Sequence, residues 1–518
     1  MQAGTKVAFN TSMMYVKVVV TIGITLYSTR LILSQLGESD FGVFNLIAGI
    51  VGMLAFFNAA VCVSIQRYMS QSIGMNDNER LVDVYKIAIK LSLLLGILMF
   101  IGIEILGYFF FDKLNIATDR MFASKIVFHF IALSTFFSVI SIVYEAAIIA
   151  HEDMFLLSLS YILDTFLKLG VAIYLVYSPF DKLIVYGILI ALICISSTII
   201  KRLFCRYKYD ESKIKTKKNL DKQLFFEIAK FSGWTSVYPL TGIFCIQGFA
   251  VILNMFGGTV VNAAYGIANQ VNGQLAYFSA TLLTAIEPQI IKSEGSGNRE
   301  RTIKLSQFAC KISFSLLSFF SIPLIIEMPY VLNLWLENVP ENTVLFCRLI
   351  LVSTLISQLT YGLQSGIQAV GKIKNYHIVL GVVKVLSVFF VFLFLKNGYP
   401  MYVVVVSLVA IEVINTVIRL MFSFKLLDIN KKNHILTMLF KLIFSFIIVY
   451  VLLQFPLHFI QESFLRIVII TMLSSSFLLI VFRFIVWDKY ECQQIKKVLL
   501  SFYEKSIKNI HKLIIKIK

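Results

Sequence analysis

Charged side chains stand inside long apolar segments of this 518-residue chain. The most central are Lys17, Glu145, Asp164, Lys168 and Lys384. At mid-membrane depth each would cost about 2.5–3.5 kcal/mol on insertion scales, so each needs an opposite charge, water or a charged ligand. Asp164 and Lys168 are four residues apart and are expected to neutralise each other. Lys384 has no acidic residue within one helical turn and is predicted to contact an anionic ligand.

Uncharged polar residues recur at helical spacing in the same apolar segments. Residues three and four apart share one helix face, so one predicted stripe comprises Ser134, Ser138, Ser141 and Glu145. A shift of 220 residues reaches a second stripe, formed by Thr354, Gln358, Tyr361 and Ser365. Such residues can also join neighbouring helices through hydrogen bonds. For any single residue this structural role and the lining of a cavity are equally good interpretations. Matching stripes in two halves of the chain favour the lining of a cavity.

The predicted cavity set combines these stripes with polar residues of other segments. Arg30 is a candidate that lies, with Glu104, Glu327 and Arg348, near enough to a membrane surface for its charge to reach water. The complete set of substrate-binding candidates is Lys17, Thr21, Arg30, Ser138, Ser141, Glu145, Asp164, Lys168, Asn269, Gln358, Tyr361, Gln364 and Lys384.

Composition defines the elements that must position these residues. Hydrophobic residues make up 58% of the chain and charged residues 15%, with a mean hydropathy of +0.82. Soluble domains are nearer half apolar and a quarter charged. Because a membrane helix needs about 20 apolar residues, the sequence predicts an all-α integral membrane protein with about 14 transmembrane helices.

The distribution of basic residues predicts the orientation. Most of the 47 Lys and Arg residues fall in the C-terminal tail and in every second polar gap between the predicted spans, on the same side as the N-terminus. The run from Lys201 to Lys222 is counted among these gaps. The opposite gaps hold only Lys113, Arg120, Lys125, Lys182, Lys396 and Arg466. By the positive-inside rule, both termini are expected in the cytoplasm. This arrangement of the +18 net charge indicates anionic membrane lipid rather than nucleic acid as its partner.

Two segment pairs indicate a tandem repeat. LGESDFG (36–42) corresponds to FGGTVVN (256–262), and SIGMNDNERL (72–81) to SEGSGNRERT (293–302). The repeat predicts two pseudo-symmetric six-helix lobes around a central cavity, followed by two extra helices. The predicted organisation is an N-lobe at 1–205, a basic cytoplasmic linker at 206–223, a C-lobe at 224–428, spans 13 and 14 at 429–487, and a basic amphipathic cytoplasmic tail at 488–518.

No catalytic or cofactor motif accompanies this organisation. The sequence has no nucleotide-binding loop and no catalytic triad spacing. Its seven cysteines show no metal-ligand spacing. We therefore expect no catalytic residue, no metal site, no cofactor and no enzymatic activity.

Short motifs resemble the polysaccharide-flippase branch of the MATE-like MOP exporter superfamily. In TRLILSQLGESDFGVFNLI (29–47) they are Arg30, Leu36 with Gly37, and Phe41 with Gly42. Gln66-Arg67-Tyr68 and the polar loop before Asn78-Glu79-Arg80 also match. The resemblance covers about residues 5 to 490, and within the superfamily the chain looks most like a translocase of O-antigen or capsule repeat units, with its organisation carrying more weight than any single motif.

The resemblance implies a flippase for undecaprenyl-pyrophosphate-linked oligosaccharides in cell-surface polysaccharide biosynthesis. It implies transport by alternating access in the bacterial cytoplasmic (inner) membrane, coupling to H⁺ or Na⁺ in some members, and polysaccharide assembly machinery as a partner. Lys17 and Lys384 would then attract the pyrophosphate. The alternative is a MATE-type ion-coupled drug or organic-cation antiporter, which requires a cavity dominated by carboxylates such as Asp164, Glu145 and Glu412.

Overall fold

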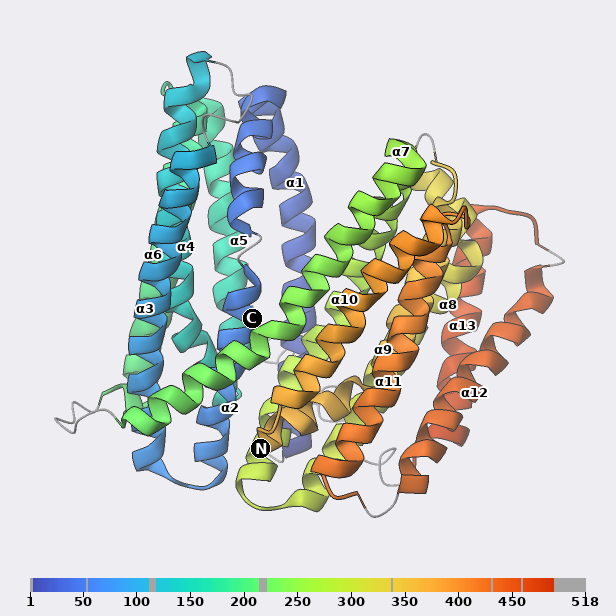
Figure 1. Cartoon of the computed structure of the whole chain (residues 1–518). Coiled ribbons are helices and arrows are strands. Elements are labelled where there is room, and N and C mark those ends of the chain that lie inside the picture. Colours follow the sequence, from blue (N-terminus) through green and yellow to red (C-terminus); the bar gives the residue numbers. More distant parts are fainter. Residues whose placement is uncertain are drawn as a thin grey trace, which may run out of the picture. The chain divides into compact units, whose positions relative to one another are not determined.

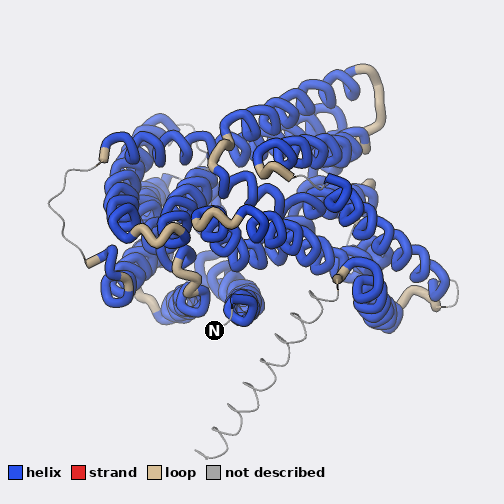
Figure 2. The backbone as a smooth tube through the Cα atoms, turned by 90° about the horizontal axis from the view of Figure 1, so that it is seen from below, coloured by secondary structure: helices blue, strands red, loops and turns tan. Residues whose placement is uncertain are grey.

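The structure, a computed structural model, describes residues 3–52, 55–110, 118–213, 221–336, 339–429, 432–457 and 460–488. Within these ranges the chain forms helices joined by short turns and contains no strand (Figure 2). The predicted all-α architecture is confirmed for this part of the chain. Residues 489–518 of the predicted tail and residues 214–220 of the predicted linker lie outside it.

The helices form two compact units (Figure 1). The N-terminal unit comprises Ser12–Pro239, and the C-terminal unit comprises Leu240–Lys518 with Met1–Thr11. The division falls at Pro239, inside a long helix. The lobe boundaries expected from the sequence repeat stay a prediction.

The N-terminal unit contains most of the first seven helices. They are α1 (Ala3–Gly52), α2 (Ala55–Gly74), α3 (Asn78–Phe110), α4 (Met121–Ala150), α5 (Met154–Tyr177), α6 (Lys182–Lys208) and the first part of α7 (Lys222–Gly295), with short 3₁₀ helices η2 (Thr118–Arg120) and η3 (Asp210–Ser212).

The C-terminal unit contains the rest of α7 and the remaining helices. They are α8 (Arg299–Trp335), α9 (Thr343–Val370), α10 (Lys374–Lys396), α11 (Val403–Leu426), α12 (Lys432–Leu457), α13 (Phe464–Val481) and the π-helical turn η4 (Phe482–Val486).

The tandem repeat is visible as two matching kinks. α1 bends at Gly37 with φ 75° and ψ 169°, and α7 bends at Gly258 with φ 72° and ψ −171°. Only glycine adopts this combination at low cost. The two glycines lie in the corresponding segments LGESDFG and FGGTVVN, so the repeat extends to the backbone conformation.

The turns before α3 and α8 also correspond. Asn76 and Gly297 both have positive φ, at 56° and 77°. The next residue caps the following helix in both turns, because Asp77 accepts from the backbone N–H of Arg80 at 2.9 Å and Asn298 accepts from that of Arg301 at 3.1 Å. Asp and Asn side chains satisfy the first N–H groups of a helix. The same turn therefore starts the third helix of each repeat.

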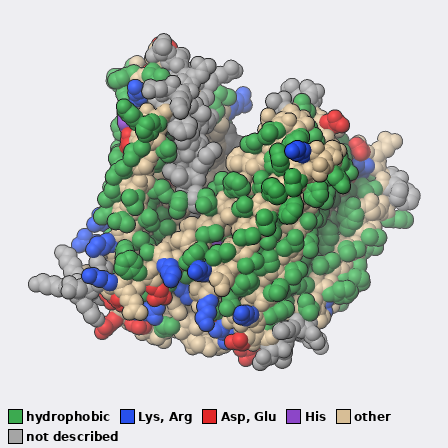
Figure 3. All heavy atoms as spheres, viewed as in Figure 1, with side chains coloured by type: hydrophobic (Ala, Val, Ile, Leu, Met, Phe, Trp, Pro, Cys, Tyr) green, Lys and Arg blue, Asp and Glu red, His purple; other side chains and the backbone are tan. Residues whose placement is uncertain are grey.

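Twelve helices within the described residues are long and apolar enough to cross a membrane. The predicted spans near Ile50 and Leu275 are not in this set. Side chains such as Phe389 of α10 and Phe440 of α12 are more than half exposed on the protein surface. Hydrophobic side chains cover much of the visible flank of the C-terminal unit (Figure 3). The chain is a multi-pass integral membrane protein.

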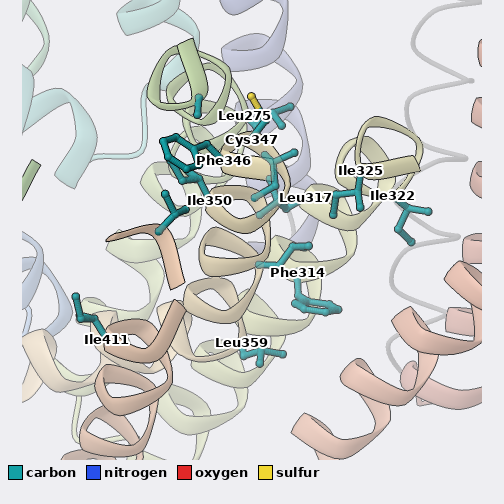
Figure 4. Close-up of a cluster of buried hydrophobic side chains, with 14 of the residues drawn as sticks. Leu275, Phe314, Leu317, Ile322, Ile325, Phe346, Cys347, Ile350, Leu359 and Ile411 are labelled. Atoms are coloured by element: carbon teal, nitrogen blue, oxygen red, sulfur yellow. The ribbon is translucent and has the colours of Figure 1, made fainter. Parts of the chain in front are cut away.

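A buried apolar cluster joins the helices of the C-terminal unit from α7 to α13, and Figure 4 shows part of it. It includes Leu275 of α7, Phe314 and Leu317 of α8, Phe346 of α9 and Ile411 of α11. Because lipid tails are as apolar as these side chains, close van der Waals packing holds membrane helices together. The fit between helix surfaces is therefore important for the stability of this unit.

Side chains at the end of α6 and in η3 contact the turn between α4 and α5. His151 Nε2 lies 2.7 Å from Glu211 Oε1, and the His151 ring stacks on Tyr209 with centroids 4.1 Å apart. The Tyr209 hydroxyl donates to Asp153 at 2.6 Å, and Lys208 pairs with the same carboxylate at 2.8 Å. Burial and the Asp153 hydrogen bond raise the pKa of Tyr209. The cluster fixes the α4–α5 turn against η3.

Arg348 satisfies a backbone carbonyl that a proline leaves without its helical donor. Pro329 has no N–H, so the carbonyl of Ile325, four residues earlier, lacks its usual partner. Arg348 Nε donates to this carbonyl at 2.8 Å, and its NH2 group donates to Ile326 O at 3.2 Å. The two hydrogen bonds to α8 thus account for the position of the Arg348 side chain, and its depth near a membrane surface stays a prediction.

We expect Arg348→Met to lower the free energy of unfolding by about 1–3 kcal/mol, the cost of leaving a buried polar group unsatisfied. Reversible unfolding in mixed micelles measures this loss. In a Pro329→Ala background the restored N–H should take over the Ile325 carbonyl, so the Arg348→Met loss should shrink. An equal loss in both backgrounds would contradict this role.

Candidate functional site

A buried cluster in the N-terminal unit is centred on Glu145 of α4. Its Oε1 lies 2.6 Å from Lys201 Nζ of α6 and accepts from Ser141 at 3.2 Å. Its Oε2 accepts from the Tyr161 hydroxyl of α5 at 3.0 Å. The Lys17 ammonium of α1 lies over the Tyr161 ring, 4.1 Å from its centroid. Four helices thus bring two cations, one carboxylate, a phenol and a hydroxyl together, and we call this set the Glu145 cluster.

The Glu145 cluster is held in a low-dielectric environment. The Lys201 side chain is 5% exposed and that of Glu145 is 22% exposed. A buried ion pair is tolerated only when further hydrogen bonds satisfy its remaining lone pairs and protons. Ser141 supplies one such bond, because it stands four residues before Glu145 on the same face of α4, and Tyr161 supplies the other.

Lys201 is the member of the Glu145 cluster that the sequence interpretation missed. It was counted with the cytoplasmic basic run, although it lies inside α6 and is 4% exposed. The sequence did contain a signal for this position. Lys201 continues the apolar segment and stands four residues after Ser197, on the same helix face.

The structure shows no ion pair between Asp164 and Lys168, although the charges of Lys168 and Lys201 both act on the Asp164 carboxyl. Asp164 Oδ2 accepts a hydrogen bond from Ser197 of α6 at 2.9 Å. Lys168 is exposed one turn along α5. The spacing of four was compatible with a pair, but the neighbouring α6 hydroxyl is the partner that Asp164 uses.

The other candidates of the N-terminal unit are spread along α1 and α4. Thr21 follows Lys17 by one turn, and its hydroxyl is buried. Arg30 is exposed on α1. Ser138 accepts from the Asn58 side chain at 3.4 Å. The structure therefore brings Lys17, Ser141 and Glu145 together and places the remaining candidates outside the Glu145 cluster.

A pocket of about 240 Å³, lined by both polar and apolar side chains, lies in the C-terminal unit. Lys384 of α10 is its basic residue and Glu412 of α11 its acidic one. An added Cβ at Gly242 would lie 3.3 Å from Lys384 Nζ, so the glycine leaves space for the ammonium group. We call it the Lys384 pocket, and its lining is Gly242, Cys245, Ile246, Tyr265, Asn269, Asn272, Ile350, Ser353, Thr354, Ser357, Lys384, Leu408, Ile411 and Glu412.

Basic and amide side chains hold the carboxylate of the Lys384 pocket. Arg419 lies 3.4 Å from Glu412 Oε2, and Asn415 donates to Oε1 at 3.2 Å. Arg419 is 2% exposed and also donates to the Ser357 carbonyl at 3.2 Å and the Thr360 hydroxyl at 3.3 Å. The sequence interpretation named Glu412 but not Arg419, which lies seven residues later on the same helix.

Of the polar residues predicted to share a face of α9, some line the Lys384 pocket and others lie outside it. Thr354 lines the Lys384 pocket and donates to Asn272. Gln358 is buried and donates to Ser357 at 3.4 Å, while Tyr361 packs against an apolar cluster. Gln364 accepts from the Tyr376 hydroxyl at 3.5 Å. Asn269 lines the pocket, but Gln358, Tyr361 and Gln364 are not among its lining residues.

Two further sequence features have structural partners. Tyr68 of the Gln66-Arg67-Tyr68 motif donates to Glu227 of α7 at 3.0 Å, and the Arg67 guanidinium lies 4.7 Å from the Phe231 ring centroid. Glu327 of α8, expected near the surface, is 1% exposed and pairs with Arg466 of α13 at 2.8 Å. Within the described part of the chain, no group of three His, Cys, Asp or Glu residues could hold a metal ion.

Neither a protein-family model nor a curated protein matches this sequence. Solved structures do match its fold. A MATE protein in complex with MaL6 is 13% identical, with a TM-score of 0.70 over 83% of this chain and 99% of that one. An outward-facing multidrug resistance MATE family transporter of the MOP superfamily is 13% identical, with a TM-score of 0.70 over 83% and 98%.

A third match is a MOP superfamily transporter from Pyrococcus furiosus, described by a binding pocket of reverse polarity that suggests a different function. It is 13% identical, with a TM-score of 0.69 over 83% of this chain and 98% of that chain. At this identity the likeness shows the fold. The chain therefore has the fold of the MATE-like transporters of the MOP superfamily.

Proposed function

We propose that this protein is a flippase that moves undecaprenyl-pyrophosphate-linked oligosaccharide repeat units across the bacterial cytoplasmic membrane. Transport proceeds by alternating access, with both termini in the cytoplasm. The observation that carries the proposal is the charge balance of the two polar sites. The carboxylates Glu145 and Glu412 are each bonded by a basic side chain, and Lys17 and Lys384 add further positive charge.

The Glu145 cluster supports binding of an anion. Lys17 and Lys201 both approach Tyr161, at 4.1 Å and 5.1 Å from the ring centroid, while Glu145 supplies one negative charge. Within the Glu145 cluster two ammonium groups face one carboxylate and leave a positive balance, with Asp164 of α5 as the next carboxyl that interacts with Lys201. In a low-dielectric site this balance attracts an anionic group such as a pyrophosphate more strongly than it would in water.

The Lys384 pocket supports binding of a phosphorylated sugar. Asn269, Asn272, Thr354 and Ser357 present amide and hydroxyl groups beside the Lys384 ammonium. Amides and hydroxyls both donate and accept hydrogen bonds, as sugar hydroxyls require. The proposal needs the polar faces of the two units to enclose one aqueous cavity, as the sequence repeat predicts, with the lipid tail remaining in the bilayer.

The second candidate function is a MATE-type ion-coupled drug or organic-cation antiporter. The fold match to a multidrug resistance MATE transporter favours it, and Asp164, bonded to Ser197, is a carboxylate for a cation. The pairing of Glu145 and Glu412 with basic residues disfavours it. The Pyrococcus furiosus transporter supports the view that pocket polarity and function vary on this fold.

Reconstitution into liposomes tests the two functions in parallel. One assay follows a fluorescent undecaprenyl-pyrophosphate oligosaccharide with a membrane-impermeant quencher, and the other follows a fluorescent organic cation under an H⁺ or Na⁺ gradient. We expect leaflet exchange of the lipid that is absent from protein-free vesicles. Gradient-driven cation movement without lipid exchange would establish the antiporter instead. A gradient dependence of lipid exchange would identify the coupling ion.

We expect Lys384→Ala to slow lipid exchange about tenfold, equivalent to ~1.4 kcal/mol of lost stabilisation of the translocating anion. Lys384→Arg keeps the charge and should retain most of the exchange. Lys17→Ala tests the other unit in the same assay. Unchanged exchange in both alanine variants would eliminate the cationic-site proposal.

A further inference from the structure

An apolar groove of about 760 Å³ lies between α5 and α6 in the N-terminal unit. Phe166 and Tyr174 are among the residues that line it from α5, and Val185 and Leu192 are among those from α6. Apart from Ser196 and a glycine, its lining side chains are hydrophobic or aromatic. None of the lining residues belongs to the Glu145 cluster or to the Lys384 pocket, so this is a separate feature, which we call the α5–α6 groove.

The α5–α6 groove is open to the hydrocarbon of the membrane. Both of its helices are long and apolar enough to cross a bilayer. Phe166, Tyr174 and Leu192 are about half exposed, at 52%, 47% and 53%. Contact between water and so much apolar surface is unfavourable. Because the groove lies on two membrane spans, hydrocarbon chains and not water are the natural occupants of its volume.

Gly170 of α5 keeps the α5–α6 groove open. It is one of the lining residues, and a Cβ added to it would have no heavy atom within 4 Å. By contrast, a Cβ at Gly248 of α7 would lie 2.9 Å from Val388 of α10, where the glycine lets two helices approach. A glycine inside a helix is unfavourable relative to alanine. No close helix contact accounts for Gly170, which instead leaves room for a ligand.

The length of the α5–α6 groove identifies the kind of occupant. The lining runs from Phe166 to Tyr174 on α5 and from Val185 to Ser196 on α6. At 1.5 Å per residue these segments are about 12–16 Å long, which is about half of the ~30 Å hydrocarbon core. A membrane helix of a partner protein would follow the full depth of the core. The acyl chain of one lipid extends through a single leaflet, as the groove does.

Polar side chains stand at the end of the α5–α6 groove next to the turn between the two helices. Lys182, the first residue of α6, is three residues before Val185 and so lies on the same helix face. Its Nζ donates to Gln35 Oε1 at 3.0 Å, which leaves two of its three N–H groups for a further acceptor. Tyr177, the last residue of α5, is 80% exposed at the same end. Tyrosine is enriched at membrane–water interfaces.

The charges around Lys182 balance. Arg120 bonds to both carboxylate oxygens of Asp40 and, through its NH1 group, to Asp181 at 2.8 Å. Together with Lys182 these side chains carry two positive and two negative charges. Lys182 can therefore donate to a lipid phosphate, but this end of the groove does not favour a lipid with a net negative charge.

We propose that the α5–α6 groove binds one glycerophospholipid, with an acyl chain lying along Gly170 and the phosphate at Lys182. The chain packs against Phe166 and Leu192, and the Tyr177 ring lies at headgroup depth. Inside a membrane, van der Waals packing takes the place of the hydrophobic effect. The fit of the chain and the bond to the phosphate therefore determine binding, and the site is independent of any transported substrate.

Photolabelling of the full-length protein in liposomes tests this site. The probe is phosphatidylethanolamine with a diazirine on one acyl chain, and mass spectrometry identifies the labelled peptides. We expect labelling to concentrate in residues 166–174 and 185–196 and to be lost there in Gly170→Phe, whose side chain fills the groove. Lys182→Gln does not fill the groove and should reduce this labelling about fivefold, the effect of losing one hydrogen bond. A phosphatidylglycerol probe should label to the same extent.

Gly102→Phe is the matched control, because Gly102 lies in the membrane span α3 and also has no heavy atom within 4 Å of an added Cβ. It should leave the labelling of the groove unchanged. Uniform labelling of all spans, or equal loss in both phenylalanine variants, would overturn the site in favour of general lipid contact. Labelling that excess polyprenyl phosphate removes and excess phospholipid does not would overturn a phospholipid as the occupant. A preference for the phosphatidylglycerol probe would overturn recognition without charge selection.

Discussion

Lys201→Met should lower the free energy of unfolding by about 3–5 kcal/mol, the cost of breaking a buried ion pair from one side. The substitution leaves the Glu145 carboxylate buried with only Ser141 and Tyr161 as donors. The lysine and methionine stems are of similar length, so the loss reports on charge more than on packing. Reversible unfolding of the purified protein in mixed micelles gives the value.

The double variant Lys201→Met, Glu145→Gln separates the pair from its surroundings. Removing both charges leaves two neutral side chains of similar volume, which is often close to neutral for stability. We expect the double variant to recover most of the loss, with a coupling energy obtained from the double-mutant cycle. Additive losses would show that Glu145 and Lys201 do not stabilise each other.

Gly362→Ala should lower the free energy of unfolding by about 3 kcal/mol, at the upper end of the cost of overpacking. A Cβ at Gly362 of α9 would overlap the carbonyl oxygen of Ser306 and lie 2.7 Å from the backbone nitrogen of Cys310, both in α8. Backbone atoms cannot move aside as a side chain can. The two helices would have to separate, and the packing of the buried cluster around Phe314 and Phe346 would loosen.

Two other glycines provide a graded comparison for Gly362→Ala. A Cβ at Gly366 would lie 2.8 Å from the Ser306 hydroxyl, a side-chain atom that can rotate, so Gly366→Ala should cost less. Gly266, in α7, has no neighbouring atom within 4 Å, and Gly266→Ala should be neutral or stabilising by up to ~1 kcal/mol through helix propensity. The same loss at all three positions would rule out close α8–α9 contact as the cause.

The two large effects have different consequences for transport. Lys201 belongs to the Glu145 cluster, so its loss should alter both stability and the proposed binding of an anion. Gly362 packs α9 against α8, so its substitution should disturb the helix that carries Thr354 and Ser357 into the Lys384 pocket. Transport measured on protein that is still folded distinguishes the two effects.

Local features of the fold were determined by the sequence. Apolar segments of sufficient length form helices in a membrane because no other element satisfies its own backbone hydrogen bonds there. The segments around Gly37 and Gly258 predicted a repeat, and the structure shows the same kink at both glycines. Periodicity also placed Ser141 and Glu145 on one helix face, where they share a hydrogen bond.

The partners of the buried charges were decided by the tertiary structure. Spacing suggested that Asp164 pairs with Lys168, but Ser197 of α6 bonds to it. Lys201 was assigned to a cytoplasmic basic run, and the bonds of Arg348 to α8 carbonyls were not predicted, because the partners of both residues lie on other helices. Periodicity along one helix defines which residues share a face. It does not define which helix that face meets, or at what rotation and depth, and these determine whether a charge finds a carboxylate, a carbonyl or lipid.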